Sequence, residues 1–373
     1  MKILVDGFGG DNAPLECIKG CRMAADELGV QVGLAGQVET LKKVAADNGV
    51  SLEGIQLVQA SQVIPVEEHA AEITKSYQDS SMAVGLKALA AGEWDAFVSA
   101  GSTGALVVGS SLLVKRIRGV KRAALASIIP TTSGCYMLMD CGANADCRPE
   151  MLVQFGIMGS AYMEKVMGIP TPRVAIVNIG AEATKGTELQ VQAYQQFQNA
   201  PVNFAGNVEA RDLPLGGCDV AVSDGFTGNV VLKLTEGMGS GFGRELKGIF
   251  MRGTLSKLAA LAVKKGIRDF KRKMDYTEYG GAPLLGIARP VIKAHGSSNA
   301  KAFKNAVCQA KSCVEQGVIP TIQQSLAVLK VKEKEAQADA PGEPSQTAQP
   351  AEQAGQAQQI EQTTAHRAGK GEA

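Results

Sequence analysis

Hydrophobic and polar positions follow two alternating periods along the chain from residue 2 to about residue 240. Short apolar runs typical of buried strands are followed by longer segments with the three- and four-residue spacing of amphipathic helices. The pattern predicts strands at 2–6 and 30–35, and helices at 13–28, 38–48, 80–91, 103–115, 151–167 and 188–199. This alternation is typical of a parallel, doubly wound sheet with helices on both faces.

Five of the apolar runs end in a short polar loop that contains glycine and leads into helix-like sequence. These junctions lie at 3–12, 96–104, 137–144, 174–180 and 220–229. Because parallel strands of an open sheet all end on one side, we expect the five loops to gather at one edge, where ligands bind. Glycine lets backbone N–H groups approach an anion closely, and the following helix adds its positive N-terminal end. The pattern therefore predicts one polar cleft suited to an anion.

The composition narrows the class of protein. At 373 residues, with 45% hydrophobic and 20% charged residues, the chain has the composition of an ordinary globular protein with a large core. A formal net charge of +1 argues against nucleic-acid binding by the protein as a whole. The eight cysteines form no C-x-x-C pair and only three histidines occur, so we expect no metal site.

The apolar runs also bear on location. Asp6 interrupts the first of them, so we expect no signal peptide and reduced, cytosolic thiols. No apolar stretch approaches the ~18–20 residues that span a bilayer. We therefore expect a cytoplasmic protein whose contact with a membrane is limited to its surface.

Residues 245–278 depart from the alternating pattern. Apolar residues recur there at helical spacing, and most of the residues between them that carry a charge are lysine or arginine. We interpret the segment as a basic amphipathic helix or helical hairpin. The candidate docking residues are Lys257, Lys264, Lys265, Arg268, Lys271 and Arg272. Anionic lipid and an acidic protein are both candidate partners, and a solvated helix face on a dimer surface is the alternative.

The composition changes again at Lys332, after which Gln, Ala, Glu, Thr and Pro replace nearly all large aliphatic residues. Such a segment cannot bury enough apolar area to offset the entropy of ordering it. We therefore predict a catalytic α/β domain at 1–331, which includes the basic segment, and a disordered Gln/Ala-rich tail at 332–373 that is dispensable for chemistry.

The glycines after the first apolar run suggest a nucleotide site, but the details argue against one. The dinucleotide fingerprint requires a third glycine where this chain has Asn12, and Asp11 places a negative charge where a pyrophosphate would lie. A nicotinamide cofactor is therefore disfavoured. No G-x-x-x-x-G-K-[ST] run occurs, which argues against a nucleotide-hydrolysing P-loop.

Three other positions carry candidate chemistry. Asn229 ends the run at 223–229, and we expect this run to form the N-terminus of a helix. Backbone N–H groups there could converge on an anion or an oxyanion. An ordinary turn with a helix cap explains the run equally well. Lys185 lies in the loop of another junction and can pair with a phosphate as a point charge. His295 could act as a general acid or base, or hold the cleft by hydrogen bonding.

Several motifs together match one known family in order along the chain. They are Gly-Gly-Asp-Asn-Ala-Pro (9–14), Ser-Ala-Gly (99–101), Thr-Gly-Ala-Leu (103–106), Gly-Ala-Asn-Ala-Asp-Cys-Arg-Pro-Glu (142–150), Asn-Ile-Gly (178–180), Thr-Lys-Gly (184–186), Gly-Asn-Val-Glu (206–209), Asp-Gly-Phe-Thr-Gly-Asn-Val-Val-Leu-Lys (224–233) and His-Gly-Ser-Ser-Asn (295–299). Through them the chain closely resembles the bacterial acyl-acyl-carrier-protein:phosphate acyltransferases of phospholipid synthesis, from residue 1 to about residue 325.

This resemblance implies a three-layer α/β/α sandwich with a mostly parallel sheet, related to phosphotransacetylases and isopropylmalate dehydrogenases, plus the basic helical insertion. It also implies a homodimer with neither a metal nor an organic cofactor. In the implied reaction, inorganic phosphate attacks the thioester of a long-chain acyl carrier protein and gives an acyl phosphate, which a membrane acyltransferase consumes. Loose contact with an anionic membrane or with that acyltransferase fits the basic segment.

Two alternatives to this function are kept. The nearer is a phosphotransacylase that acts on short-chain acyl-CoA, and the farther is a non-catalytic scaffold at a membrane surface.

The chain departs from the pattern of the family it resembles in two places. Ser102 stands where the family usually has asparagine, which shortens a hydrogen-bonding group. Ala181 and Ala183 stand where acidic residues are common before Lys185, and their neutrality favours an anion there.

For the implied reaction we expect Lys185 to hold phosphate, Asn229 to polarise the thioester carbonyl, and His295 to orient phosphate or protonate the departing thiol. The other candidates for binding substrate and phosphate are polar or glycine residues of the junction loops. They are Gly9, Gly10, Asp11, Asn12, Gly101, Ser102, Thr103, Gly104, Asn144, Asp224, Gly225, Thr227 and Gly228.

Overall fold

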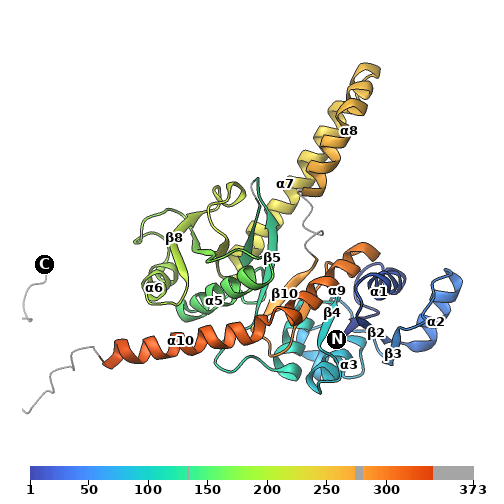
Figure 1. The fold of residues 1–373 in the computed structure, drawn as a ribbon, viewed down its shortest axis with the longest axis horizontal. Helices are drawn as coiled ribbons and strands as arrows, with labels where there is room; N and C mark the ends of the chain where they lie inside the picture. Colours follow the sequence, from blue (N-terminus) through green and yellow to red (C-terminus); the bar gives the residue numbers. More distant parts are fainter. Residues whose placement is uncertain (133, 274–279, 339–373) are drawn as a thin grey trace, which may run out of the picture. The chain divides into compact units, whose positions relative to one another are not determined.

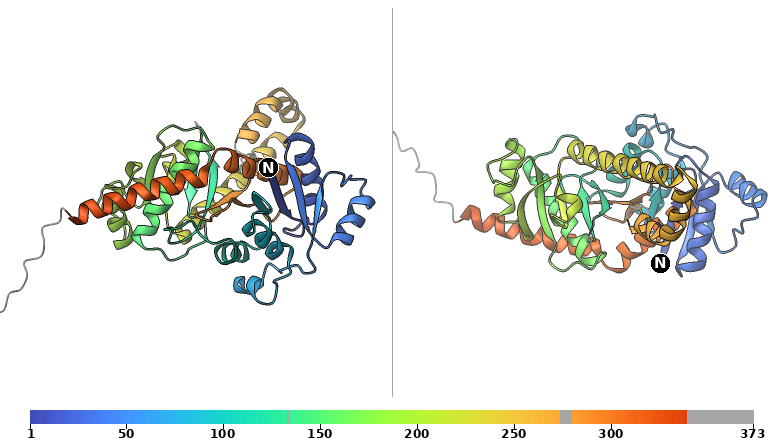
Figure 2. Two further views of the ribbon diagram at one scale, coloured as in Figure 1. Left: turned by 60° about the horizontal axis from the view of Figure 1, so that its bottom comes forward. Right: turned by 90° about the horizontal axis from the view of Figure 1, so that it is seen from above.

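The computed structural model describes residues 1–132, 134–273 and 280–338 and is drawn as ribbons in Figures 1 and 2. The chain divides into two units, Met1–Glu333 and Lys334–Ala373. All the described strands lie in the first unit, which therefore holds the whole sheet.

In the described part of the chain, eleven strands form one sheet in the order β3-β2-β1-β4-β11-β10-β5-β6-β9-β7-β8. The strands are β1 (Lys2–Asp6), β2 (Gln31–Gly36), β3 (Gln56–Gln59), β4 (Ala96–Ser99), β5 (Ala124–Pro130), β6 (Cys135–Met139), β7 (Arg173–Asn178), β8 (Asn203–Glu209), β9 (Val220–Val222), β10 (Ala282–Leu285) and β11 (Val291–Lys293). Most neighbours pair in parallel, and only the β11–β10, β10–β5 and β5–β6 pairs among these strands are antiparallel.

The helices confirm the predicted alternation to within a few residues at their ends. They are α1 (Leu15–Glu27), α2 (Val38–Asp47), α3 (Ser81–Ala90), α4 (Thr103–Gly109), α5 (Pro149–Lys165), α6 (Glu188–Phe197), α7 (Gly225–Met251), α8 (Thr254–Lys273), α9 (Ala300–Glu315) and α10 (Val318–Ala338), with shorter turns η1 (Ala70–Thr74), η2 (Ser110–Val114) and η3 (Leu213–Leu215). The helix predicted at 103–115 is α4 followed by the π-helical turn η2.

Helices cover both faces of the sheet, because successive strand residues point to opposite sides. Ile3 and Val5 of β1 share a hydrophobic cluster with α1 and α9, whereas Leu4 packs with α3 and α4 on the other face. In the other half of the sheet, Met137 packs toward α5, and Leu138 belongs to the cluster beneath α7. The predicted three-layer α/β/α architecture with a mostly parallel sheet is confirmed.

The direction of the strands reverses across the middle of the sheet, and this overturns one prediction. β5 and β6 form an antiparallel pair across a short connection, and β10 is antiparallel to both of its neighbours. Consequently β1, β4 and β11 end at one edge of the sheet, while β6, β9 and β7 end at the opposite edge. The expectation that all five junctions meet at one edge was wrong, because short hairpin connections force neighbouring strands to be antiparallel.

The junction loops therefore form two groups. The first loop group comprises residues 6–12, 99–104 and 293–298, which follow β1, β4 and β11. The second loop group comprises residues 140–147, 178–187 and 223–229, which follow β6, β7 and β9.

The predicted basic segment lies on two helices. α7 begins at Gly225, well before the predicted start at 245. α8 packs against it, so the segment is a helical pair, labelled α7 and α8 in Figure 1. The side chains of Lys257, Lys264, Lys265, Arg268 and Lys271 are exposed. The side chain of Arg272 and residues 274–279 lie outside the described ones.

At the other end of the chain, α10 continues to Ala338, so the first residues of the tail predicted from 332 onward are helical. The rest of that tail lies outside the described residues. Within the described ranges, no helix combines the length and the apolar character needed to cross a membrane.

Candidate functional site

The first loop group is built on a buried carboxylate at the end of β1. Asp6 accepts hydrogen bonds from Ser99 Oγ at 2.7 Å and from the backbone N–H of Phe8 at 3.2 Å. A Cβ at Gly9 would lie 2.7 Å from Asp6 Oδ2 and 2.6 Å from the nitrogen of Gly101, so only glycine lets the two loops close over the carboxylate. Burial raises the pKa of Asp6, and its hydroxyl and backbone donors oppose that shift.

The loop after β1 is also tied to the loop after β11. The backbone N–H of Asp11 donates to the carbonyl oxygen of Gly296 at 2.8 Å. The amide of Asn12 donates to the carbonyl oxygens of Ser297 and Ser298 at 3.3 and 3.4 Å. Asn12 therefore uses its amide to hold this loop group together.

His295 is exposed within this group. Its Nδ1 accepts the backbone N–H of Ser297 at 3.2 Å and lies 2.8 Å from Ser297 Oγ. Because Nδ1 accepts a backbone hydrogen bond, the proton of the neutral ring is assigned to Nε2. Nε2 is then the ring atom that can donate a proton or a hydrogen bond.

The residues before α4 complete the first loop group. Ser102 is the N-cap of α4, and its Oγ accepts the backbone N–H of Ala105 at 3.5 Å. Thr103 begins the helix, and Gly104 is exposed beside it. Ser102 therefore serves as a helix cap.

The second loop group is built on another buried carboxylate, Asp140, which follows β6. Its Oδ1 accepts the backbone N–H groups of Leu125, Gly142 and Ala143 at 3.0, 3.3 and 3.1 Å. Its Oδ2 accepts the backbone and side-chain N–H groups of Asn144 at 2.7 and 2.9 Å. Burial raises the pKa of Asp140, while these donors favour the charged form.

The N-terminus of α7 packs directly on this loop. The backbone N–H of Gly225 donates to the carbonyl oxygen of Asn144 at 2.7 Å. Asp224 caps the helix by accepting the backbone N–H and the Oγ1–H of Thr227, both at 2.8 Å. The polar groups of Thr227 and Asn144 thus have internal partners. Asn229 is exposed, and its side chain lies 3.6 Å from the position of a Cβ at Gly142.

Lys185 lies in the remaining loop of the second group. The side-chain amide of Asn178 donates to the carbonyl oxygen of Lys185 at 3.0 Å. The backbone N–H of Lys185 donates to the backbone carbonyl oxygen of Glu182 at 3.1 Å. These bonds fix the loop backbone, while the lysine side chain is exposed. The exposed ammonium group of Lys185 can therefore bind an anion from solvent.

α7 extends from the second loop group across a hydrophobic cluster of the sheet. It starts at the second group, and Val231 and Leu232 pack on the same hydrophobic cluster as Ala282 of β10. Ala282 is the strand partner of Lys293, which belongs to the first group. The predicted site residues therefore lie at two edges of the sheet, and α7 begins at one of them.

Two residues of the site were not assigned from the sequence, although a signal was present. Asp6 and Asp140 each follow a buried apolar run directly, where an acidic residue is costly unless it has hydrogen-bond partners. Each turns out to organise the glycine-rich loop that follows it.

A family model described as "Fatty acid synthesis protein" matches residues 1–321. The chain is 46% identical over 329 residues to the phosphate acyltransferase of Alkaliphilus oremlandii, covering 88% of this chain and 98% of that one. It is 47% identical over 331 residues to the phosphate acyltransferase of Desulforamulus reducens, covering 87% of this chain and 97% of the other.

Among solved structures, a phosphotransacetylase from Streptococcus pyogenes is similar to this chain with a TM-score of 0.53 and 17% identity. The match covers 88% of this chain and 94% of that one. At this identity the likeness concerns the fold alone, and it confirms the predicted phosphotransacetylase-like fold.

Proposed function

Because the chain belongs to the phosphate acyltransferase family, we propose that it transfers an acyl group from a thioester to inorganic phosphate, with long-chain acyl carrier protein as the donor. The observation that carries this proposal is the identity of 46% over 98% of a curated phosphate acyltransferase. Acyl phosphate and the free thiol of the carrier are the products. The acyl phosphate would serve phospholipid synthesis by way of a membrane acyltransferase.

The reaction requires little beyond positioning and charge. A phosphate oxygen attacks the carbonyl carbon, the carbon–sulfur bond breaks, and the proton of the phosphate hydroxyl ends on sulfur. Asn229, at the exposed start of α7, would donate to the carbonyl oxygen as it becomes negative. Lys185 would supply positive charge for phosphate, and His295 Nε2 would orient phosphate or protonate the leaving thiol.

The three residues are divided between the two loop groups, so the proposed site includes residues of both. Asn229 and Lys185 belong to the second loop group and His295 to the first. α7 begins at the second loop group, and its residues Val231 and Leu232 pack on the same hydrophobic cluster as Ala282, the strand partner of Lys293.

A second copy of this chain is the partner proposed for α7. Large apolar side chains recur every four residues along it and are exposed: Phe226, Val230, Leu234, Met238, Phe242 and Leu246. A continuous apolar stripe of this length is unfavourable in water, and a homodimer would cover it.

The basic segment on α8 is proposed to contact an anionic membrane surface. Leu255, Leu258 and Leu261 are exposed on the same helix as the basic residues, which is the pattern of an interfacial helix. An acidic carrier protein is the competing occupant. Vesicle co-sedimentation of a variant with Lys264, Lys265, Arg268 and Lys271 changed to Glu would separate them: full vesicle binding together with weaker carrier affinity contradicts the membrane proposal.

The function itself is tested with purified protein and two acyl donors. We expect phosphate-dependent release of free carrier protein from long-chain acyl carrier protein, and much slower turnover of short-chain acyl-CoA. Preference for short-chain acyl-CoA would favour the alternative phosphotransacylase. If neither donor is turned over in a phosphate-dependent way, the acyl-transfer proposal is wrong and the non-catalytic membrane-surface scaffold remains.

A further inference from the structure

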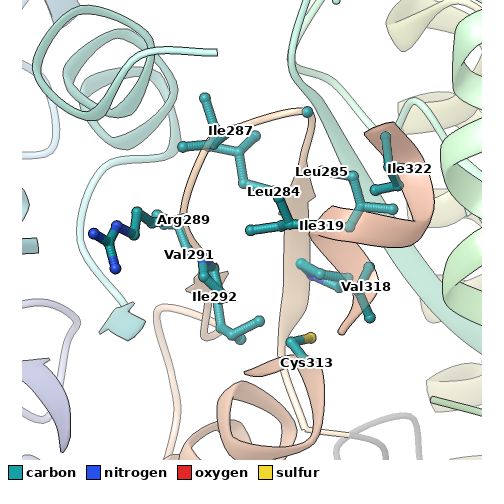
Figure 3. Close-up of a pocket in the computed structure, with 13 residues that line it drawn as sticks. Leu284, Leu285, Ile287, Arg289, Val291, Ile292, Cys313, Val318, Ile319 and Ile322 are labelled. Atoms are coloured by element: carbon teal, nitrogen blue, oxygen red, sulfur yellow. The ribbon is translucent and has the colours of Figure 1, made fainter. Parts of the chain in front are cut away.

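The pocket between the β10–β11 hairpin and the start of α10 is poorly suited to phosphate. Figure 3 shows that apolar side chains, among them Leu284, Ile292 and Ile322, line it. Arg289 also borders it, but its guanidinium lies beside Gly92, where a Cβ would be 3.1 Å from Nη2. The loop after β7, which carries the exposed Lys185, offers phosphate a cation in solvent instead.

The turn at residues 182–185, here called the lysine turn, is held at both ends by side-chain amides. The backbone N–H of Lys185 donates to the carbonyl oxygen of Glu182 at 3.1 Å and closes the turn. Asn207 of β8 donates its Nδ2–H to the same carbonyl oxygen of Glu182 at 2.8 Å. Asn178 of β7 donates its Nδ2–H to the carbonyl oxygen of Lys185 at 3.0 Å. Two neighbouring strands therefore anchor the lysine turn to the sheet.

An irregularity in β8 directs Asn207 toward this turn. The pairing of β7 with β8 shifts by one residue after Val174 and Phe204, so that Ala205 is an extra residue in β8. Gly206 follows with a φ of +93°, a conformation that favours glycine. In a regular strand Phe204 and Asn207, three residues apart, would point to opposite faces of the sheet. The extra residue brings both side chains to the same face, as β-bulges beside functional sites often do.

The bond to Glu182 also accounts for the amide of Asn207. Its Oδ1 atom is buried and has no hydrogen-bond partner within the described residues. The side chain of Lys185 in turn depends on the backbone of this loop, because its stem crosses Gly180. A Cβ at Gly180 would lie 3.1 Å from Lys185 Cγ and 3.6 Å from its Cδ. The lysine turn therefore fixes where the stem of Lys185 begins, and Asn207 helps to fix the lysine turn.

We propose that Asn207 is a positioning residue for phosphate, which acts by holding the lysine turn so that Lys185 presents its ammonium group to the nucleophile. This proposal rests on the proposed function and deepens it, since it names a residue that acts through Lys185 without touching the substrate. Because the turn is already ordered in the folded protein, phosphate binding does not have to order it.

The test compares Asn207→Ala with Asn203→Ala at the start of the same strand. Asn203 donates its Nδ2–H to the carbonyl oxygen of Thr171 at 3.1 Å, a bond of the same kind outside the Lys185 loop. We expect the KM for phosphate to rise by about two- to tenfold in Asn207→Ala, as loss of one neutral hydrogen bond predicts. The kcat at saturating phosphate and the KM for the acyl donor should stay at the values of the wild type.

The control variant distinguishes positioning from stability. Asn203→Ala should lose a similar amount of stability in urea and keep the wild-type KM for phosphate. Equal KM values for phosphate in the two variants would overturn the proposal, because a merely structural role of Asn207 predicts this result. If Asn207→Ala does not fold, Asn178→Ala removes the other amide and should raise the KM for phosphate in the same way. An unchanged KM in that variant would also overturn the proposal.

A double-mutant cycle tests whether Asn207 acts through Lys185. Added to Lys185→Met, the Asn207→Ala change should raise the KM for phosphate no further, because the cation that it positions is already gone. A further rise of the same size as in the wild-type background would contradict the proposal.

Calorimetric binding of inorganic phosphate, without an acyl donor, separates this proposal from the proposed function. Weaker phosphate binding in Asn207→Ala than in Asn203→Ala supports the positioning role even if no acyl transfer is found. Acyl transfer by the wild type, together with equal phosphate binding in the two variants, refutes the positioning role alone.

Discussion

Replacement of Gly228 by alanine tests whether the loop of Asp140 holds the first turn of α7 in its working position. A Cβ at residue 228 would lie 1.9 Å from the carbonyl oxygen of Asp140 and 2.8 Å from Ser223 Oγ, whereas ordinary contact begins at 3.4 Å. The first turn of α7 must therefore move from the loop by roughly the difference, about 1.5 Å.

The energies of this change can be compared. Overpacking against a backbone atom costs about 1–3 kcal/mol, and the better helix propensity of alanine returns at most about 1 kcal/mol. We therefore expect the free energy of unfolding to fall by about 1–2 kcal/mol. Turnover should fall on the order of a hundredfold, because the displacement carries Asn229 with it and misplacement by about 1 Å is enough for such a loss.

Urea unfolding and phosphate-dependent release of carrier protein measure the two effects. Gly239→Ala is the matched control on the same helix, because a Cβ there meets nothing within 4 Å. The control should gain about 0.5–1 kcal/mol in stability and keep its turnover. Equal stability and equal turnover in the two variants would refute the reasoning.

Three further outcomes are expected. Asn229→Ala should lose turnover by about ten- to a thousandfold, measured at saturating donor, and a loss confined to carrier affinity would count against its role. Phe242→Asp places a charge on the apolar stripe of α7 and should shift the protein toward a monomer in light scattering, whereas an unchanged mass would argue against dimerisation through this stripe. Burial opposes ionisation of Asp219, but its hydrogen bonds with Arg173 prevail and lower its pKa, so the ion pair stabilises the fold at neutral pH and is lost on acidification. Asp219→Asn should therefore lower the urea midpoint at pH ~7, and its difference from the wild type should shrink as the pH falls below ~3.9. A difference that does not shrink in acid would show another origin.

Much of the fold could be predicted because the signals are local. Alternation of period identifies β1 and the helices through α6. The direction of the strands was not predictable in this way, since β10 reaches the middle of the sheet from a distant part of the chain and reverses the polarity there. Pairing of this kind depends on tertiary contacts that a local pattern does not contain.

The polar junction loops could be predicted from the sequence, but the hydrogen bonds within them could not. Thr227 and Asn144 were expected to face substrate, and their polar groups instead bind Asp224 and Asp140. Residue type and spacing give the chemistry available to a loop, but only the folded backbone shows which donors are already used.

The central claim is that phosphate, and not water, accepts the acyl group. Radiolabelled inorganic phosphate, incubated with the protein and long-chain acyl carrier protein, tests it most directly. The account predicts label in an acyl phosphate, formed in equal amount with the free carrier thiol. Free carrier thiol accompanied by unlabelled fatty acid, with no label in any acyl product, would contradict it.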